Sequence, residues 1–306
     1  MRGLKIVGLT AFLALAGMVH AGGEESPRRR AKPPQWSQEV RDVFFDDARK
    51  ELVGNRPVLR AAKTQAEVVE SEGSLQNVDS SWSDLIDAET LQSEVKQTIN
   101  NVAGAIATSG KFNGEGHQQC QRDFSLLAVL FGVIEEFDEQ VRWQRNAGVV
   151  RRHLKQAAAM CEEASEESYS AAKQEYGLLT DLLRGQPTID DSLQEKGQVE
   201  RSQLMLRMEQ SVEEVLGSAL SSKKNFRRRS TEVIHESQLL AVLAKLIVEE
   251  GYESADDEEF SGFARQLGEA STALVQAAKE ENYEAARSAV GRLTQSCSTC
   301  HEDFRG

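Results

Sequence analysis

Two stretches of the sequence carry nearly the same apolar run, and they decide the fold. Residues 126–134 read Leu-Leu-Ala-Val-Leu-Phe-Gly-Val-Ile, and residues 239–247, 113 positions later, read Leu-Leu-Ala-Val-Leu-Ala-Lys-Leu-Ile. Upstream, the same offset aligns the apolar residues of 91–104 with those of 204–217. Downstream, after a slip of one residue, 169–179 aligns with 283–293. This self-similarity predicts two copies of one domain, 82–187 and 198–306.

Within each copy the apolar residues recur every three or four positions, which is the period of an amphipathic helix. We expect helices over 84–108, 118–138, 146–165 and 168–184 in the first copy, and over 196–221, 231–250, 257–279 and 281–305 in the second. Four helices with short connections favour an antiparallel four-helix bundle. The predicted fold class is therefore all-α, with two tandem antiparallel four-helix bundles.

The start of the chain has the pattern of a secretory signal. Residues 1–21 combine early basic residues, an apolar run over 6–18 and small residues before a cleavage point after Ala21. The apolar run is shorter than the ~20 residues that span a bilayer, so we expect no membrane span. The mature protein is expected to be periplasmic or otherwise exported. Residues 22–81 are interpreted as a leader and an N-terminal helical segment.

The charge balance excludes one large class of function. The chain of 306 residues has 36 Lys and Arg against 49 Asp and Glu, a net charge of -13. Because phosphate contacts need a basic face, we expect no nucleic-acid partner. No Ser/His/Asp, phosphate-loop or paired-carboxylate arrangement stands out, so the protein is not predicted to be an enzyme.

The C-terminus carries the motif with the most specific chemistry. Cys297-Ser-Thr-Cys300-His301 is a CxxCH, the attachment signature of c-type haem. On a helix, positions i, i+3 and i+4 share one face, so two thiols can reach the haem vinyl groups while the imidazole lies beneath the iron. The matching positions of the first copy are Leu183, Gln186 and Pro187, which cannot hold haem. We expect one covalent haem c, carried by the second copy. The alternative without haem is a disulfide-bonded or free CxxC.

Residues 198–306 resemble the cytochrome c′ class. The resemblance rests on Cys297-Ser-Thr-Cys300-His301-Glu-Asp-Phe304-Arg305, on Tyr283-Glu-Ala-Ala-Arg287 before it, and on an Arg followed four residues later by the distal residue, here Arg201 and Met205. It implies that Cys297 and Cys300 form the thioether bonds and that His301 is the proximal iron ligand. It also implies that Arg305 lies on the proximal side and that Arg201 approaches a haem propionate.

In this class a distal methionine gives a six-coordinate electron carrier, whereas a leucine leaves a gas-binding haem. Met208 competes with Met205 for the role of distal ligand. Met208 aligns with Val95 of the first copy and Met205 with Gln92, so the common core does not require an apolar residue at 205. We therefore favour Met205, an electron carrier and an unidentified redox partner protein. The alternative is a gas-binding or gas-sensing module with an open distal site.

Three further features carry weaker predictions. Cys120 and Cys161 are expected at one end of the first bundle, where an oxidising compartment favours a disulfide over two separate buried thiols. The basic residues of 223–229 are expected in a loop, either simply solvated or steering an acidic redox partner. His153 and His235 are assigned no role, and an oligomer is possible.

Overall fold

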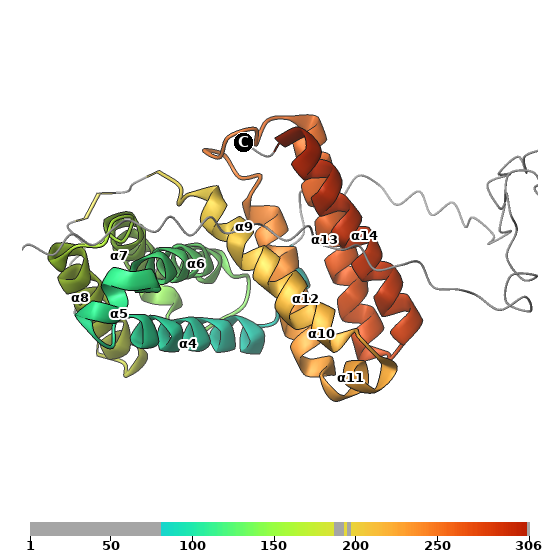
Figure 1. Cartoon of the computed structure of the whole chain (residues 1–306), viewed down its shortest axis with the longest axis horizontal. Helices are drawn as coiled ribbons and strands as arrows, with labels where there is room; N and C mark the ends of the chain where they lie inside the picture. Colours follow the sequence, from blue (N-terminus) through green and yellow to red (C-terminus); the bar gives the residue numbers. More distant parts are fainter. Residues whose placement is uncertain (1–80, 187–192, 195–196, 305–306) are drawn as a thin grey trace, which may run out of the picture. The chain divides into compact units, whose positions relative to one another are not determined.

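The computed structural model describes residues 81–186, 193–194 and 197–304 (Figure 1). The predicted signal peptide, the segment up to residue 80 and Arg305 lie outside these residues. The described residues fall within one compact unit, Glu70–Gly306. They form helices and no strand, so the predicted all-α fold is confirmed. No helix in the described ranges is long and apolar enough to cross a membrane.

The first copy contains four main helices close to the predicted ranges. They are α4 (Ala88–Ala105), α6 (His117–Glu136), α7 (Ala147–Met160) and α8 (Glu166–Leu183). The carboxylate of Asp87 accepts the Thr90 backbone N–H at 2.7 Å and begins α4. After α8, Gly185 has a φ of +81°, the left-handed conformation typical of a helix C-terminus. Shorter elements are α3 (Trp82–Leu85), α5 (Ser109–Lys111), η1 (Phe112–Gly116) and η2 (Gln144–Asn146).

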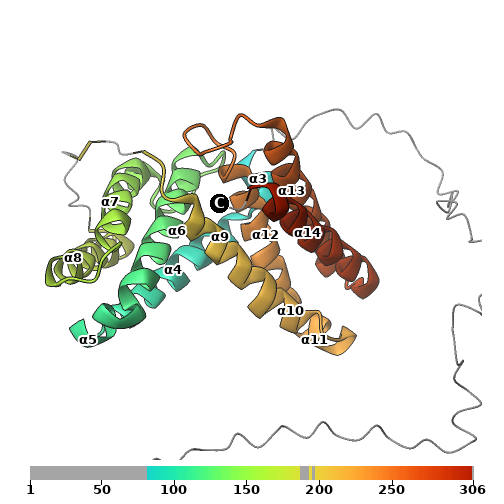
Figure 2. The same cartoon turned by 45° about the horizontal axis from the view of Figure 1, so that its top comes forward.

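The second copy repeats this order. Its main helices are α9 (Arg201–Gln210), α12 (Ser230–Leu246), α13 (Glu258–Lys279) and α14 (Tyr283–Phe304). A π-helical segment, η3 (Ser211–Leu216), and α10 (Gly217–Ala219) continue α9. The basic segment expected to be a loop instead forms α11 (Lys223–Arg228), because the Ser222 hydroxyl accepts the Asn225 backbone N–H and caps it. In both views α13 and α14 run side by side (Figures 1 and 2).

Equivalent contacts around one tyrosine recur in the two copies. The Tyr169 hydroxyl donates to the Ile106 carbonyl, and the Tyr283 hydroxyl donates to the Leu220 carbonyl, each across 63 residues. The same two tyrosines lie against Phe112 and Phe226 respectively. The tertiary contacts therefore repeat along with the sequence pattern.

The π-helical segment η3 explains where the repeat changes register. Thr98 and Ser211 are both buried at the original offset, but at the end of η3 it is Leu216, not Val215, that is buried in the place of Val102. A π-helical turn adds one residue to a helix, so the copies differ by one position from there onward. The alignment of Val102 with Val215 was therefore wrong. In the first copy the π-helical segment η1 adds a residue in turn, so the offset between the copies is 113 again at residues 126–134.

The apolar run of 126–134 forms an apolar centre between helices of both copies. α6 packs against α4 and α7 of its own copy and also against α9 of the other copy. Of residues 126–134, all but Gly132 are buried. A helix that is apolar on every side requires this surrounding by other helices.

A buried charge network joins the copies beside this apolar centre. Arg207 donates to Glu94 at 3.0 Å and to Glu236 at 2.9 Å, and the Nε2 of His235 lies 2.7 Å from a Glu94 oxygen. Glu94 and Arg207 are 113 residues apart, which is the repeat offset, so equivalent positions of the two copies contact each other. His235 and Arg207 thus belong to the interface between the copies. Arg207 also fixes α9, the helix that carries Met205.

Candidate haem site

α14 presents the sequence motif to a cavity. Cys297 and Cys300 are half-buried and line it together with His301, whose side chain is exposed. Ser296, between these residues and the core, donates a hydrogen bond to the Phe263 carbonyl at 2.8 Å and fixes α14 against α13. Burial raises the pKa of both thiols, so they are held protonated at neutral pH. The structure thus brings Cys297, Cys300 and His301 to one wall of one cavity.

The cavity has a volume of about 860 Å³, within the range of cofactor pockets. α9 contributes Met205 and Met208, and α12 and α13 contribute Leu240 and Leu267. Met208 is only 5% exposed and packs in the core, whereas Met205 is half-buried. Both thioethers therefore line the same cavity as the CxxCH, and burial assigns the core role to Met208.

An aromatic wall closes one side of the cavity. The Phe304 ring lies edge-on to Phe260, with centroids 5.4 Å apart, and to Phe263, with centroids 6.3 Å apart. The guanidinium of Arg201 lies 4.6 Å from the Phe260 centroid and donates a hydrogen bond to the Glu253 carbonyl. Arg201 is therefore held at the cavity edge by a cation–π contact and by a backbone oxygen.

One buried polar atom in the cavity wall has no hydrogen-bond partner among the described residues. Tyr252, in the segment between α12 and α13, is 9% exposed, and its hydroxyl makes no hydrogen bond with the described residues. A buried hydroxyl without a partner costs free energy. The walls thus offer apolar rings, a cation and an unused hydroxyl, together with two thiols, an imidazole and a thioether. This set fits haem c, a large apolar ring with carboxylate substituents and an iron.

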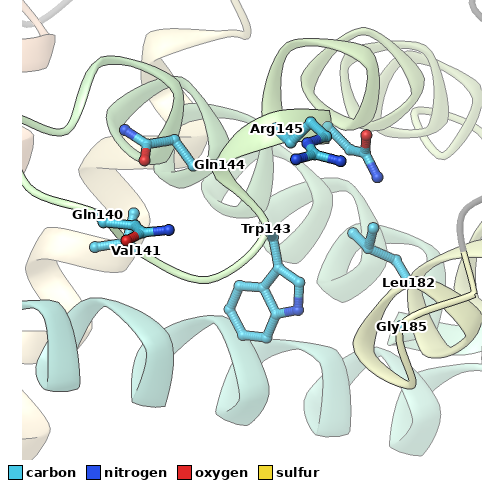
Figure 3. Close-up of a pocket in the computed structure, with 8 residues that line it drawn as sticks. Gln140, Val141, Trp143, Gln144, Arg145, Leu182 and Gly185 are labelled. Carbon is cyan, nitrogen blue, oxygen red and sulfur yellow. The ribbon is translucent and has the colours of Figure 1, made fainter.

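The corresponding end of the first copy has different chemistry. A cavity of about 530 Å³ is lined there by Trp143, Arg145, Leu182, Gly185 and neighbouring residues. In Figure 3 the Trp143 indole points from its loop toward the helices, with Leu182 and Gly185 beside it. The ring packs near Phe131, with centroids 6.2 Å apart. No thiol, imidazole or thioether is among the residues that line this cavity.

Two of the weaker predictions are corrected. The basic helix α11 lies at the end of the bundle remote from the motif, since Phe226 contacts Tyr283, the first residue of α14 (Figure 1). Cys300 lies 17 positions after Tyr283 along α14, a helical rise of roughly 25 Å. A partner steered there would dock far from the haem. Cys120 and Cys161 are both buried and close enough for Cys161 to raise the pKa of the Cys120 thiol, but they are free thiols and not the favoured disulfide.

Sequence reasoning missed several cavity residues. Phe260 and Phe263 were visible only as apolar positions of a helix, and Tyr252 lies in a segment without periodicity. Nothing in the sequence indicated that these residues face the CxxCH. Arg305, which the resemblance placed on the proximal side, lies outside the described residues.

Comparison with known proteins agrees with this site. The family model described as Cytochrome C′ matches residues 254–305, which include the segment from Ser254 to the end of α13 and the whole of α14. No curated protein and no solved structure matches the chain. The match supports a c-type cytochrome with covalently bound haem c.

Proposed function

We propose that the protein is an exported monohaem c-type cytochrome that carries single electrons. The observation that carries the proposal is the convergence of two thiols, an imidazole and the thioether of Met205 on one cavity of suitable size. Cys297 and Cys300 would hold the haem by thioether bonds, and His301 and Met205 would ligate its iron. Bound there, haem supplies a one-electron couple whose potential depends on ligand identity and burial.

The protein's own residues would keep the iron environment constant during electron transfer. Ser296 fixes α14, which carries His301, and the Arg207 network fixes α9, which carries Met205. The phenylalanine wall limits water access beside the ring. Two ligands on separately fixed helices favour a low-spin site that changes little on reduction.

The test is a spectrum of the matured protein, with and without carbon monoxide. We expect one haem per chain by mass, a low-spin spectrum and slow or weak gas binding, because gas must displace Met205. Met205→Ala removes the ligand and leaves a cavity, so the spectrum should become high-spin and gas binding should quicken. Met208→Leu is the matched control, since a swap of similar volume in a core usually costs under ~1.5 kcal/mol.

A high-spin wild-type protein that takes up carbon monoxide freely would favour the gas-binding alternative. If Met208→Leu loses the low-spin spectrum while Met205→Ala keeps it, the ligand is Met208. If the protein carries no covalent haem, the remaining interpretation of the CxxC is a disulfide-bonded or free pair of cysteines.

The proposed partner is a redox protein with a basic face. Four exposed carboxylates line the cavity mouth: Glu200, Glu209, Glu213 and Glu253. Among the described residues, Leu206 is the exposed large hydrophobic side chain, at 43%, and it lies at the same mouth. An apolar centre within an acidic rim suits a partner of opposite charge.

Small charged reductants test this rim without the partner. A cationic ruthenium ammine complex should react faster than an anionic cyanoferrate complex of matched driving force, and added salt should reduce the difference. Glu209→Gln with Glu213→Gln should slow the cation, whereas Glu284→Gln at the far end of α14 should not. Equal rates for both ions would contradict a basic partner.

A further inference from the structure

The unpartnered hydroxyl of Tyr252 indicates a position where a ligand atom belongs. Tyr252 is nine-tenths buried and lines the cavity that contains the CxxCH, and no hydrogen bond to the described residues satisfies its oxygen. Buried hydroxyl groups in native proteins nearly always have a partner. The missing partner is therefore expected among the atoms that fill the cavity.

The neighbouring charges indicate what kind of atom this is. Arg201 lines the same cavity and is close enough to Tyr252 for its positive charge to act on the pKa of the hydroxyl. The Arg201 side chain is held from two sides, by the Phe260 ring and by the Glu253 carbonyl, so its position does not depend on a ligand. A fixed guanidinium beside an unused hydroxyl forms a pair of donors for an anion.

The tyrosine remains a donor throughout the physiological range. Burial, and then the charge of Glu249, raise the pKa of Tyr252 above its ordinary value, although Arg201 acts in the opposite direction. A protonated phenol can donate one hydrogen bond, and a carboxylate oxygen accepts it. Haem carries two carboxylates at one edge and no other anionic group.

We propose that Tyr252 binds a haem carboxylate by donating its hydroxyl hydrogen to the propionate that Arg201 neutralises. This inference rests on the proposed presence of haem in the cavity, but not on whether the haem carries electrons or binds gas. Tyr252 is thus a binding residue for the haem edge, contributed by the segment between α12 and α13.

The matured protein and the full chain prepared without haem test the proposal together. In the haem-free chain, Tyr252→Phe should leave the unfolding temperature unchanged or raise it, because it removes a buried hydroxyl that has no partner. In the haem-bound protein the same substitution removes a charge-assisted hydrogen bond and should lower the unfolding temperature by about 2–4 °C. The matched control is Tyr283→Phe, which loses a hydrogen bond to the Leu220 carbonyl at 2.9 Å and should lower it in both forms.

The pH dependence of the reduction potential gives a second measurement. Loss of a donor to the ionised propionate raises the pKa of that propionate, so the pH-dependent part of the potential should move to higher pH in Tyr252→Phe. Equal effects of Tyr252→Phe in the two forms, with an unchanged pH profile, would overturn the assignment while leaving the haem site intact. Failure of the wild-type chain to take up covalent haem would overturn both.

Discussion

Arg207 connects the two copies, and replacing it tests whether they act as one folded unit. Arg207→Met keeps much of the aliphatic side chain but removes hydrogen bonds to Glu94 at 3.0 Å and to Glu236 at 2.9 Å. Both carboxylates are buried, at 2% and 6% exposure, so each would lose a cation where water cannot replace it. Removing one partner of a buried ion pair costs about 3–5 kcal/mol.

The expected loss in the free energy of unfolding lies at the lower end of this range, because both carboxylates keep another partner. Glu94 keeps its contact with His235 at 2.7 Å, and Glu236 keeps the Ser211 hydroxyl at 2.6 Å. We therefore expect a loss of about 3 kcal/mol, which is a fall of roughly 1.5 M in the urea midpoint for a slope near 2 kcal/mol/M. Urea unfolding of the matured protein, followed by far-ultraviolet circular dichroism and by haem absorbance, measures it.

Two further variants distinguish the effect of unpaired buried charges from nonspecific destabilisation of the fold. Adding Glu94→Gln and Glu236→Gln to Arg207→Met removes the unpaired charges and should recover part of the loss. Arg184→Met breaks an exposed pair with Asp181 and should cost under about 0.5 kcal/mol. If Arg207→Met costs no more than Arg184→Met, or if the two probes report separate transitions, the network does not couple the copies.

Two other predictions concern buried groups of the first copy. Burial raises the pKa of Asp123 to about 7, so its folded form holds a proton more tightly than its unfolded form, and the stability that this provides is lost as pH rises through about 7. Asp123→Asn should therefore stabilise the protein against urea more at about pH 8 than at about pH 4, and a pH-independent gain would contradict the assigned cause. Cys120 and Cys161 are fully buried and free, so a thiol reagent should find neither in the folded protein and both after unfolding without reductant. No reaction after unfolding would show that they are bridged.

The sequence by itself determined the features that depend on neighbouring residues. Helix positions followed from apolar residues spaced three and four apart, and the observed bounds of α13, Glu258–Lys279, lie within one residue of those predicted. The geometry of Cys297, Cys300 and His301 also depends only on the helix that carries them, because positions i, i+3 and i+4 share a face wherever the helix lies. The sequence of 126–134 is apolar on every side of its helix, but it does not specify which helices surround it.

The tertiary structure decided everything that joins distant segments. Glu94 and Arg207 are 113 residues apart in the sequence, and only packing of α9 against the first copy makes them partners. Tyr252 and Phe260 face the motif because α13 returns antiparallel to α14 and brings the preceding segment to the same end of the bundle. The basic residues of α11 lie far from the haem site because α9 leads away from that site toward α11, and α14 returns to it. Such contacts depend on how helix faces fit together, and the local periodicity that reveals a helix does not specify its neighbours.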